Sequence, residues 1–232
     1  MHGRLCRKAN PQSQRSTNSY RPKHTSISPP FPIFTRQIHS KQVSTKYINH
    51  QNFKGADFSG AALEKSEYEQ CTFSDCSFFE ADLSGVIFAD CVFENCDLSM
   101  AQLKNTALRE VRFKHCKLLG LRFDECNPFS LAMDFDSCAL HFASFYKLKL
   151  KNTAWKNCNL EETDFTESDL GGSVFERCDL GGAVFENTIL EDCDLRTAFN
   201  FSIDPQNNRI RGARFSSQNL AGLLERYRII IE

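Results

Sequence analysis

Large apolar residues recur at every fifth position along most of this chain. From Phe53 to Phe123 each fifth residue is Phe, Leu or Tyr, and from Phe135 to Leu195 each is Phe, Leu or Trp. The residue two places earlier is small, mostly Ala, Cys, Ser, Thr or Val, and the remaining positions are mostly polar or Gly. A period of five matches neither the 3.6 residues of a helix nor the two of a strand, so it indicates an internal repeat.

The five-residue unit is plain in three segments: Ala56-Asp-Phe-Ser-Gly60, Ala81-Asp-Leu-Ser-Gly85 and Cys178-Asp-Leu-Gly-Gly182. These units resemble those of the pentapeptide-repeat proteins, and the resemblance covers roughly residues 51–215. In that family four pentads form one square coil of a right-handed quadrilateral β-helix, with the large and the small residue pointing inward. The resemblance therefore implies an all-β solenoid, and the 28 in-phase pentads of this chain would form seven coils.

Residues twenty apart should then lie directly above one another in neighbouring coils. Each inward Leu or Phe would contribute ~1.5–3 kcal/mol through burial, and each coil would cover the next. One column of this kind forms the expected structural core: Phe73, Phe93, Phe113, Phe135, Trp155, Phe175 and Leu195.

Three segments depart from the repeat. Residues 124–133 shift the phase by two and contain Pro128, which cannot donate to a ladder, so we expect a bulge or short loop there. Residues 200–208 have the composition of a turn, within a β-helix that we place at 46–215. In residues 216–232 the apolar side chains follow a helical spacing, which predicts a short C-terminal α-helix with Ser216 or Ser217 as its N-cap.

Residues 1–45 form a different kind of chain. Residues 1–50 hold nine of the 28 Lys and Arg residues and no Asp or Glu. The segment is also rich in Ser, Thr and Pro, and we expect it to be disordered. Three interpretations stay open: an upstream stretch translated from a mis-called start, an organellar transit peptide, or a genuine basic arm.

Charge is banded along residues 51–232, which carry 19 basic and 29 acidic residues. Residues 99–123 hold six bases and one acid, whereas residues 158–195 hold eleven acids and one Arg. Ion pairs are expected between neighbouring coils at Glu94–Lys114, Lys104–Asp124 and Lys149–Asp169, and along the column Asp136, Lys156, Glu176 and Arg196. Because exposed pairs contribute only ~0–1 kcal/mol each, they would tune register more than stability.

No motif in the chain carries recognisable catalytic, cofactor or metal chemistry. Ten of the eleven cysteines occupy the small inward position, where a buried free thiol behaves as a small hydrophobe. His115 and His141 lie in no metal or triad spacing. We therefore expect no enzyme activity, no cofactor and no metal, and the unpaired thiols favour a reducing, cytoplasmic location, or an organellar one if residues 1–45 are a transit peptide.

Three functions fit these observations. The first is a protein-binding scaffold whose partner the sequence does not identify. The second follows from resemblance to the Qnr-type quinolone-resistance group, which implies protection of DNA gyrase or topoisomerase IV by partial DNA mimicry. The third, nucleic-acid binding through the basic band of residues 99–123, is disfavoured because aromatic interleaving is missing and neighbouring acids would repel phosphate. We expect no membrane partner.

The Qnr resemblance also extends to the C-terminal segment, which in that group packs against its twofold mate. It implies a homodimer through this segment, and the alternative is a cap that closes the end of the solenoid. The implied interface residues are Leu220, Leu223, Leu224, Tyr227, Ile229 and Ile231.

Overall fold

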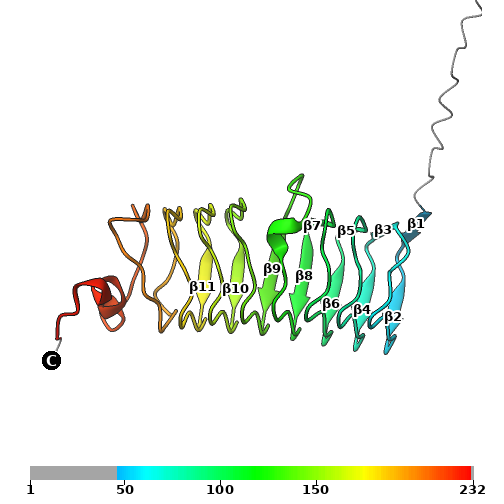
Figure 1. Ribbon diagram of the computed structural model, residues 1–232, viewed down its shortest axis with the longest axis horizontal. Coiled ribbons are helices and arrows are strands. Elements are labelled where there is room, and N and C mark those ends of the chain that lie inside the picture. Colours follow the sequence, from blue (N-terminus) through cyan, green and yellow to red (C-terminus); the bar gives the residue numbers. More distant parts are fainter. Residues whose placement is uncertain (1–45, 231–232) are drawn as a thin grey trace, which may run out of the picture. The chain divides into compact units, whose positions relative to one another are not determined.

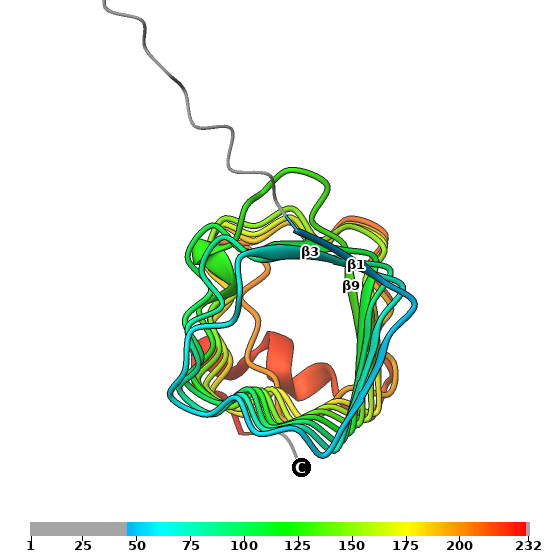
Figure 2. The ribbon, with the colours of Figure 1, turned by 90° about the vertical axis from the view of Figure 1, so that its right-hand side faces the viewer.

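The computed structural model describes residues 46–230, which form a quadrilateral β-helix (Figure 1). Residues 1–45 and Ile231 lie outside the described residues, so the interpretations of the N-terminal segment and of Ile231 are not addressed. Viewed along its axis, the β-helix has a nearly square outline in which successive coils superimpose (Figure 2). Within residues 46–230, no helix has the length and hydrophobicity needed to cross a bilayer.

Two parallel sheets occupy adjacent sides of the square, and every strand pairs with residues from the neighbouring coils. The four-stranded sheet consists of β1 (Lys46–Asn49), β3 (Ser66–Glu69), β5 (Ile87–Ala89) and β7 (Ala107–Arg109). The seven-stranded sheet consists of β2 (Asn52–Lys54), β4 (Thr72–Ser74), β6 (Val92–Glu94), β8 (Val111–Lys114), β9 (Met133–Asp136), β10 (Ala154–Lys156) and β11 (Val174–Glu176).

The other two sides are held by isolated parallel bridges at the same spacing, such as Asp57 with Ser77 and Ser77 with Asp97. A coil turns most corners where the residue two places after an inward residue adopts a left-handed backbone. Asp75, Asn95 and His115 stand at this position with φ between 53° and 56°. This requirement explains why Gly, Asn and Asp are frequent at these positions of the repeat.

The seven column residues named above are stacked and almost fully buried in the core. Phe113 lies 5.2 Å from Phe93 and 5.4 Å from Phe135 between ring centroids, and Trp155 lies 4.5 Å from Phe135. Neighbouring columns meet these rings edge to face, as Phe123 does with Phe135. Such geometries are the preferred arrangements of aromatic pairs, so the column contributes packing energy beyond its buried area.

The C-terminal segment differs from its expectation. Instead of an α-helix it forms two short 3-10 turns, η2 (Leu220–Leu223) and η3 (Glu225–Tyr227), and neither Ser216 nor Ser217 caps them. The Ile203 N–H donates to the carbonyl of Gly222 (2.9 Å). In an α-helix this carbonyl would instead accept an N–H from the next turn of the helix. A segment this short lacks intrinsic helical stability, and packing onto the last coil decides its conformation.

The expected partners lie beside one another, but several of their side chains form other ion pairs. The partners do occupy neighbouring register positions, for example Glu94 beside Lys114 and Asp136 beside Lys156. Within the described residues, however, the expected pairs do not form, and Lys151 instead of Lys149 reaches Asp169 (3.2 Å). Arg196 pairs with Asp194 and Arg177 with Glu176. An exposed Lys or Arg can pair with any of several nearby carboxylates, because solvent screening makes the energies of these ion pairs nearly equal.

Candidate functional sites

One corner of the β-helix carries an exposed apolar ridge, formed by Phe79, Met100, Leu119 and Phe142 and called here the corner ridge. These residues come from four successive coils, linked through bonds such as Met100 N–H to the Leu119 carbonyl (2.9 Å). Phe79, Met100 and Phe142 are 42%, 57% and 66% exposed. Hydrophobic residues that follow one another along an edge form a contiguous patch, which is typical of an interaction site.

The backbone makes two ridge residues unusual. Met100 and Phe142 both adopt φ 60°, the left-handed conformation that other corners give mainly to Gly, Asn or charged residues. For a side chain without a local hydrogen bond, this conformation costs ~1–2 kcal/mol. Because both side chains project into solvent, burial recovers little of that cost. These two residues therefore contribute little to the stability of the isolated β-helix.

Polar groups flank the ridge near Phe142. His141 Nε2 lies 2.9 Å from Glu161 Oε2, and its Nδ1 is buried without a hydrogen-bond partner among the described residues. Lys117 and Arg122 belong to the same coil as Leu119. Arg122 is held by both carboxylate oxygens of Asp124, at 2.9 and 2.6 Å. The ridge thus has the apolar centre and polar rim of a protein interface.

A second feature lies where the repeat breaks. Short 3-10 turn η1 (Phe123–Glu125) leads into residues 126–132, which project from the side that carries the four-stranded sheet (Figures 1 and 2). Asn127 N–H still bonds the Thr106 carbonyl (2.8 Å), as in an ordinary coil. Pro128 comes five residues after Phe123, where the repeat requires an inward residue. Pro128 is nevertheless exposed, as is Phe129 (71%), so the chain leaves the core at this point. Leu131 packs against the core in its place.

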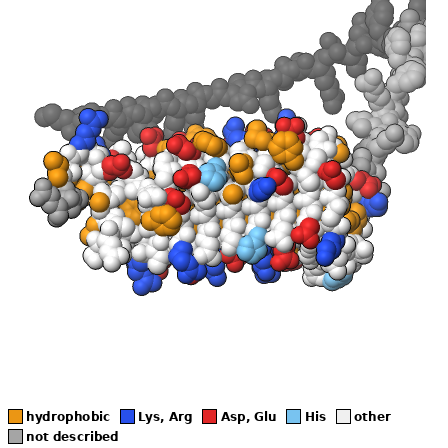
Figure 3. Space-filling model, turned by 90° about the horizontal axis from the view of Figure 1, so that it is seen from below, with side chains coloured by type: hydrophobic (Ala, Val, Ile, Leu, Met, Phe, Trp, Pro, Cys, Tyr) orange, Lys and Arg blue, Asp and Glu red, His pale blue; other side chains and the backbone are white. Residues whose placement is uncertain are grey.

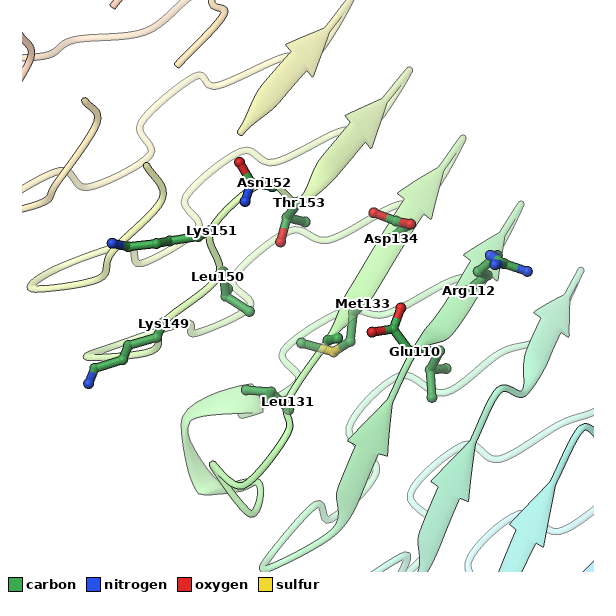
Figure 4. Close-up of a pocket in the computed structure, with 12 residues that line it drawn as sticks. Glu110, Arg112, Leu131, Met133, Asp134, Lys149, Leu150, Lys151, Asn152 and Thr153 are labelled. Atoms are coloured by element: carbon green, nitrogen blue, oxygen red, sulfur yellow. The ribbon is translucent and has the colours of Figure 1, made fainter. Parts of the chain in front are cut away.

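This outward swing separates two coils on that side. A polar cavity of about 190 Å³ opens between them, lined on one side by residues 131–134 and on the other by residues 149–153 (Figure 4). Glu110 and Arg112 of the preceding coil also line it. Asp134 Oδ1 accepts the Ala154 N–H (3.0 Å), so a side chain replaces one ladder bond. This opening is called the slot below.

The ten cysteines of the described residues are all free and buried. Cys96 Sγ donates to the Phe73 carbonyl (3.3 Å), and Thr106 Oγ1 makes the equivalent bond to the Leu83 carbonyl (2.7 Å). Burial raises the pKa of Cys91 and of Cys193 to about 12, which keeps these thiols protonated. Six of the cysteines stack in one column: Cys76, Cys96, Cys116, Cys138, Cys158 and Cys178. Cysteine and threonine thus play the same structural role at this position.

We identify no assembled metal or catalytic site within residues 46–230. No group of three or more His, Cys, Asp or Glu side chains there is placed to hold a metal ion. His115 stands at a corner with φ 53°, and His141 is engaged by Glu161. The two histidines belong to different coils and are not brought together with a nucleophile.

Charged side chains cover the outside of the β-helix. On the face shown in Figure 3, acidic and basic side chains are intermingled, with apolar ones scattered among them. Several carboxylates also serve the fold: Asp164, Asp169 and Asp179 each accept the backbone N–H two residues later, at 2.9–3.1 Å. The acidic band of residues 158–195 therefore combines structural capping with a dense negative charge.

The C-terminal residues implied as an interface lie at the end of the β-helix. Leu220, Leu224, Tyr227 and Ile229 are 36–54% exposed. Leu223 packs against the core of its own chain. Asn219 Nδ2 bonds the carbonyls of Leu195 and Ala198, at 3.2 and 2.9 Å. The segment thus covers the last coil and still presents apolar side chains outward.

Sequence reasoning identified the columns but missed the corner ridge. The sequence did contain a signal for the ridge. The two positions that follow an inward Phe or Leu point outward and mostly hold polar residues or Gly, but large apolar residues stand there at Phe79, Met100, Leu119 and Phe142. Only the twenty-residue stacking shows that they adjoin.

Comparison with known proteins agrees with this architecture. The profile of the pentapeptide repeat region matches residues 86–154, and the profile of pentapeptide repeats in eight copies matches residues 143–182 and 158–196. No curated protein matches the chain significantly.

Among solved structures, a trypsin-treated form of QnrB1, a plasmid-mediated fluoroquinolone resistance protein, has the same fold. It aligns with a TM-score of 0.50 and 23% identity over 81% of this chain and 92% of its own. HetL, a pentapeptide repeat protein involved in heterocyst differentiation regulation from the cyanobacterium Nostoc sp. strain PCC 7120, is 18% identical over 75% of this chain and 90% of its own, with a TM-score of 0.27. A pentapeptide repeat protein from the Arabidopsis thaliana thylakoid lumen is 24% identical over 51% of this chain and 67% of its own, with a TM-score of 0.28.

Proposed function

We propose that this chain, which belongs to the pentapeptide-repeat family, is a non-catalytic scaffold that binds a partner protein through the corner ridge. The observation that carries the proposal is the left-handed backbone of Met100 and Phe142, two large apolar residues that are more than half exposed. Residues that cost stability in the isolated chain are expected where they contribute to binding.

The ridge also has the form of a binding surface. Met100 and Phe142 stand on either side of the coil that carries Leu119, so a partner helix or loop could contact all three apolar side chains at once. Truncation of a large side chain at the centre of an interface commonly costs ~2 kcal/mol or more in binding. The two exposed aromatic side chains of the ridge would supply most of this energy.

The test compares proteins retained by the full chain and by matched variants. The ridge variant combines Met100→Asn and Phe142→Asn, since Asn accepts the left-handed conformation. The control combines Val174→Asn and Val184→Asn, which replace two exposed apolar side chains (40% each) outside the ridge. A partner retained by the parent and the control but lost by the ridge variant supports the proposal. A set of retained proteins that is the same for all three rejects it.

A second candidate, protection of a type II topoisomerase, is favoured by the density of the acidic band. Residues 158–195 carry a net charge of −10 within about two coils. At ~4.8 Å per coil this is about one negative charge per ~1 Å of axis, compared with one per ~1.7 Å of duplex DNA. The fold shared with QnrB1, a fluoroquinolone resistance protein, adds a reason to test it.

The assay for this candidate is gyrase or topoisomerase IV activity in the presence of a fluoroquinolone. Rescue of supercoiling or decatenation by the chain would support topoisomerase protection. Absence of both rescue and inhibition with the two enzymes would reject it and leave the scaffold proposal, which depends on a different surface.

A further inference from the structure

The slot has an unused strand edge. In an intact pair of coils on this side, the Asp169 N–H donates to the Leu148 carbonyl (2.8 Å), the Leu150 N–H to the Asp169 carbonyl (2.7 Å) and the Asn152 N–H to the Gly171 carbonyl (3.0 Å). Lys149 and Lys151 occupy the positions equivalent to Asp169 and Gly171, one coil earlier. Within residues 46–230, the Lys149 N–H and the carbonyls of Lys149 and Lys151 have no hydrogen-bond partner.

The cause is Pro128. A residue at its position would normally donate its N–H to the next coil, but proline has none, and residues 128–130 swing outward. The inserted residues bond backward instead, through Ala132 N–H to the Leu108 carbonyl (3.0 Å) and Val111 N–H to the Ala132 carbonyl (3.0 Å). The four-stranded sheet therefore stops at β7. The backbone edge of residues 149–151 therefore faces the slot, and no described backbone segment of the preceding coil pairs with it.

The spacing of the unpaired backbone N–H and carbonyl groups favours binding of an extended peptide. Two carbonyls at alternate residues and one N–H form the pattern that a parallel strand recognises. The cavity of about 190 Å³ is below the ~300–1,000 Å³ typical of small-molecule pockets. An added strand needs little volume, because its backbone supplies the bonds and its side chains can remain outside.

Charge around the slot points to an acidic occupant. Residues 99–156 carry ten Lys or Arg and five Asp or Glu, so the slot lies in the basic middle of an otherwise acidic β-helix. Lys151 is engaged by Asp169 and Asp134 by the Ala154 N–H. Arg112, Lys149 and Glu110 line the slot and form no ion pair with the part of the chain that the structure describes, so the slot has two unpaired cations and one unpaired carboxylate. The basic residues 1–45 are a poorer match for this site.

We propose that the slot accepts an extended acidic segment of a partner protein as the missing rung of the four-stranded side. The segment runs parallel to residues 149–151. Two alternate N–H groups of the segment donate to the carbonyls of Lys149 and Lys151, and one of its carbonyls accepts the Lys149 N–H. Acidic side chains at its ends face Arg112 and Lys149. This surface differs from the corner ridge, so the two proposals stand or fall separately.

Three capped synthetic pentapeptides are the probes: an acidic one with the order Asp, Val, Ala, Val, Asp; a basic one with Lys at both ends; and the acidic one with its alternate donor nitrogens methylated. Binding to the isotope-labelled full chain is followed by nuclear magnetic resonance at the Lys149 amide. We expect the acidic peptide to shift and protect this amide, and to bind at least tenfold more tightly than either of the others.

Three variants of the chain complete the test. Deleting residues 128 and 129 restores the twenty-residue spacing, closes the slot and should abolish binding, while Phe129→Ala keeps the loop length and should leave binding unchanged. Lys149→Glu, an exposed exchange that leaves the fold intact, should reverse the preference to the basic peptide.

Three outcomes would overturn the proposal. The first is no binding of the acidic peptide to the parent chain. The second is loss of the expected selectivity, shown by equal binding of the methylated peptide or by binding that the deletion variant retains. The third is tighter binding of the basic peptide to the parent, which would make residues 1–45 the better occupant.

Discussion

The Sδ atom of Met100 lies only 2.7 Å from the point where a β-carbon on Gly120 would stand, one coil further along. Gly120 therefore leaves the space that the Met100 side chain occupies over the next coil. The Met100 side chain therefore covers part of the coil that carries Leu119. The absence of a side chain at Gly120 is thus part of the proposed docking site.

Replacing Phe142 by Asn should stabilise the isolated chain. Phe142 adopts φ 60° and is 66% exposed, so Asn removes backbone strain and gives up little burial. We expect the free energy of unfolding to rise by about 1 kcal/mol, which corresponds to ~2–4 °C in melting temperature for a domain of this size. Urea and thermal denaturation would measure it. A destabilised variant would mean that Phe142 contributes to folding and not to binding.

Replacing Phe113 by Asp should prevent soluble folding. The side chain is 2% exposed and stacked between Phe93 and Phe135, so the carboxylate would be buried without a partner. The control Phe113→Leu keeps an apolar side chain and should fold at a cost of ~1–3 kcal/mol. Soluble yield and circular dichroism would distinguish the two. Melting of the Asp variant like the parent would contradict the inward assignment of this column.

Replacing Leu224 by Glu tests the homodimer that the Qnr resemblance implies. Leu224 is 36% exposed at the end of the β-helix, beside other outward apolar side chains, so a charge there would oppose association of two copies. We expect light scattering to report a dimer for the parent and a monomer for the variant. A folded variant with an unchanged dimer mass would exclude this segment as the interface, and a monomeric parent would leave it as a cap.

The buried thiols should be unreactive in the native protein. All ten cysteines of the described residues are buried away from a reagent in solvent, and burial raises the pKa of Cys91 and Cys193 to about 12, which disfavours the reactive thiolate. Titration with a thiol reagent at pH 8 should detect none of the ten cysteines of the described residues before denaturation, and all ten afterwards. Rapid modification of these cysteines in the folded protein would show that the core opens.

Acid should destabilise the β-helix through its capping carboxylates. Hydrogen bonds from Ser84 lower the pKa of Asp82 below its ordinary value. A lowered folded-state pKa adds stability above the unfolded pKa of ~3.9, and this stability is lost as the pH falls through the folded pKa. Lowered pKa values also occur at Asp57, Asp136 and Asp194.

Asp82→Asn isolates this effect, because Asn still accepts the Ser84 N–H but does not titrate. The melting temperature of the parent should fall between pH 5 and pH 3, and that of the variant should fall less. Identical pH profiles would show that the Asp82 carboxylate does not contribute to acid sensitivity.

The repeat alone determined the fold, because a strict period of five places every inward residue in the same environment. Phe113 could be assigned to the core without coordinates, since its neighbours twenty-odd residues away are also aromatic. The small position could likewise be recognised, since Cys96 and Thr106 make the same bond to the coil before them.

The departures from the repeat were decided only by the tertiary structure. The C-terminal residues form 3-10 turns because Ile203, nineteen positions away, takes the Gly222 carbonyl. Leu131 replaces Pro128 in the core because a ladder cannot use a residue without an N–H. The corner ridge and the slot arise between neighbouring coils. The repeat predicts which residues stack there, but the exposure of the ridge side chains and the opening at the slot depend on the folded backbone.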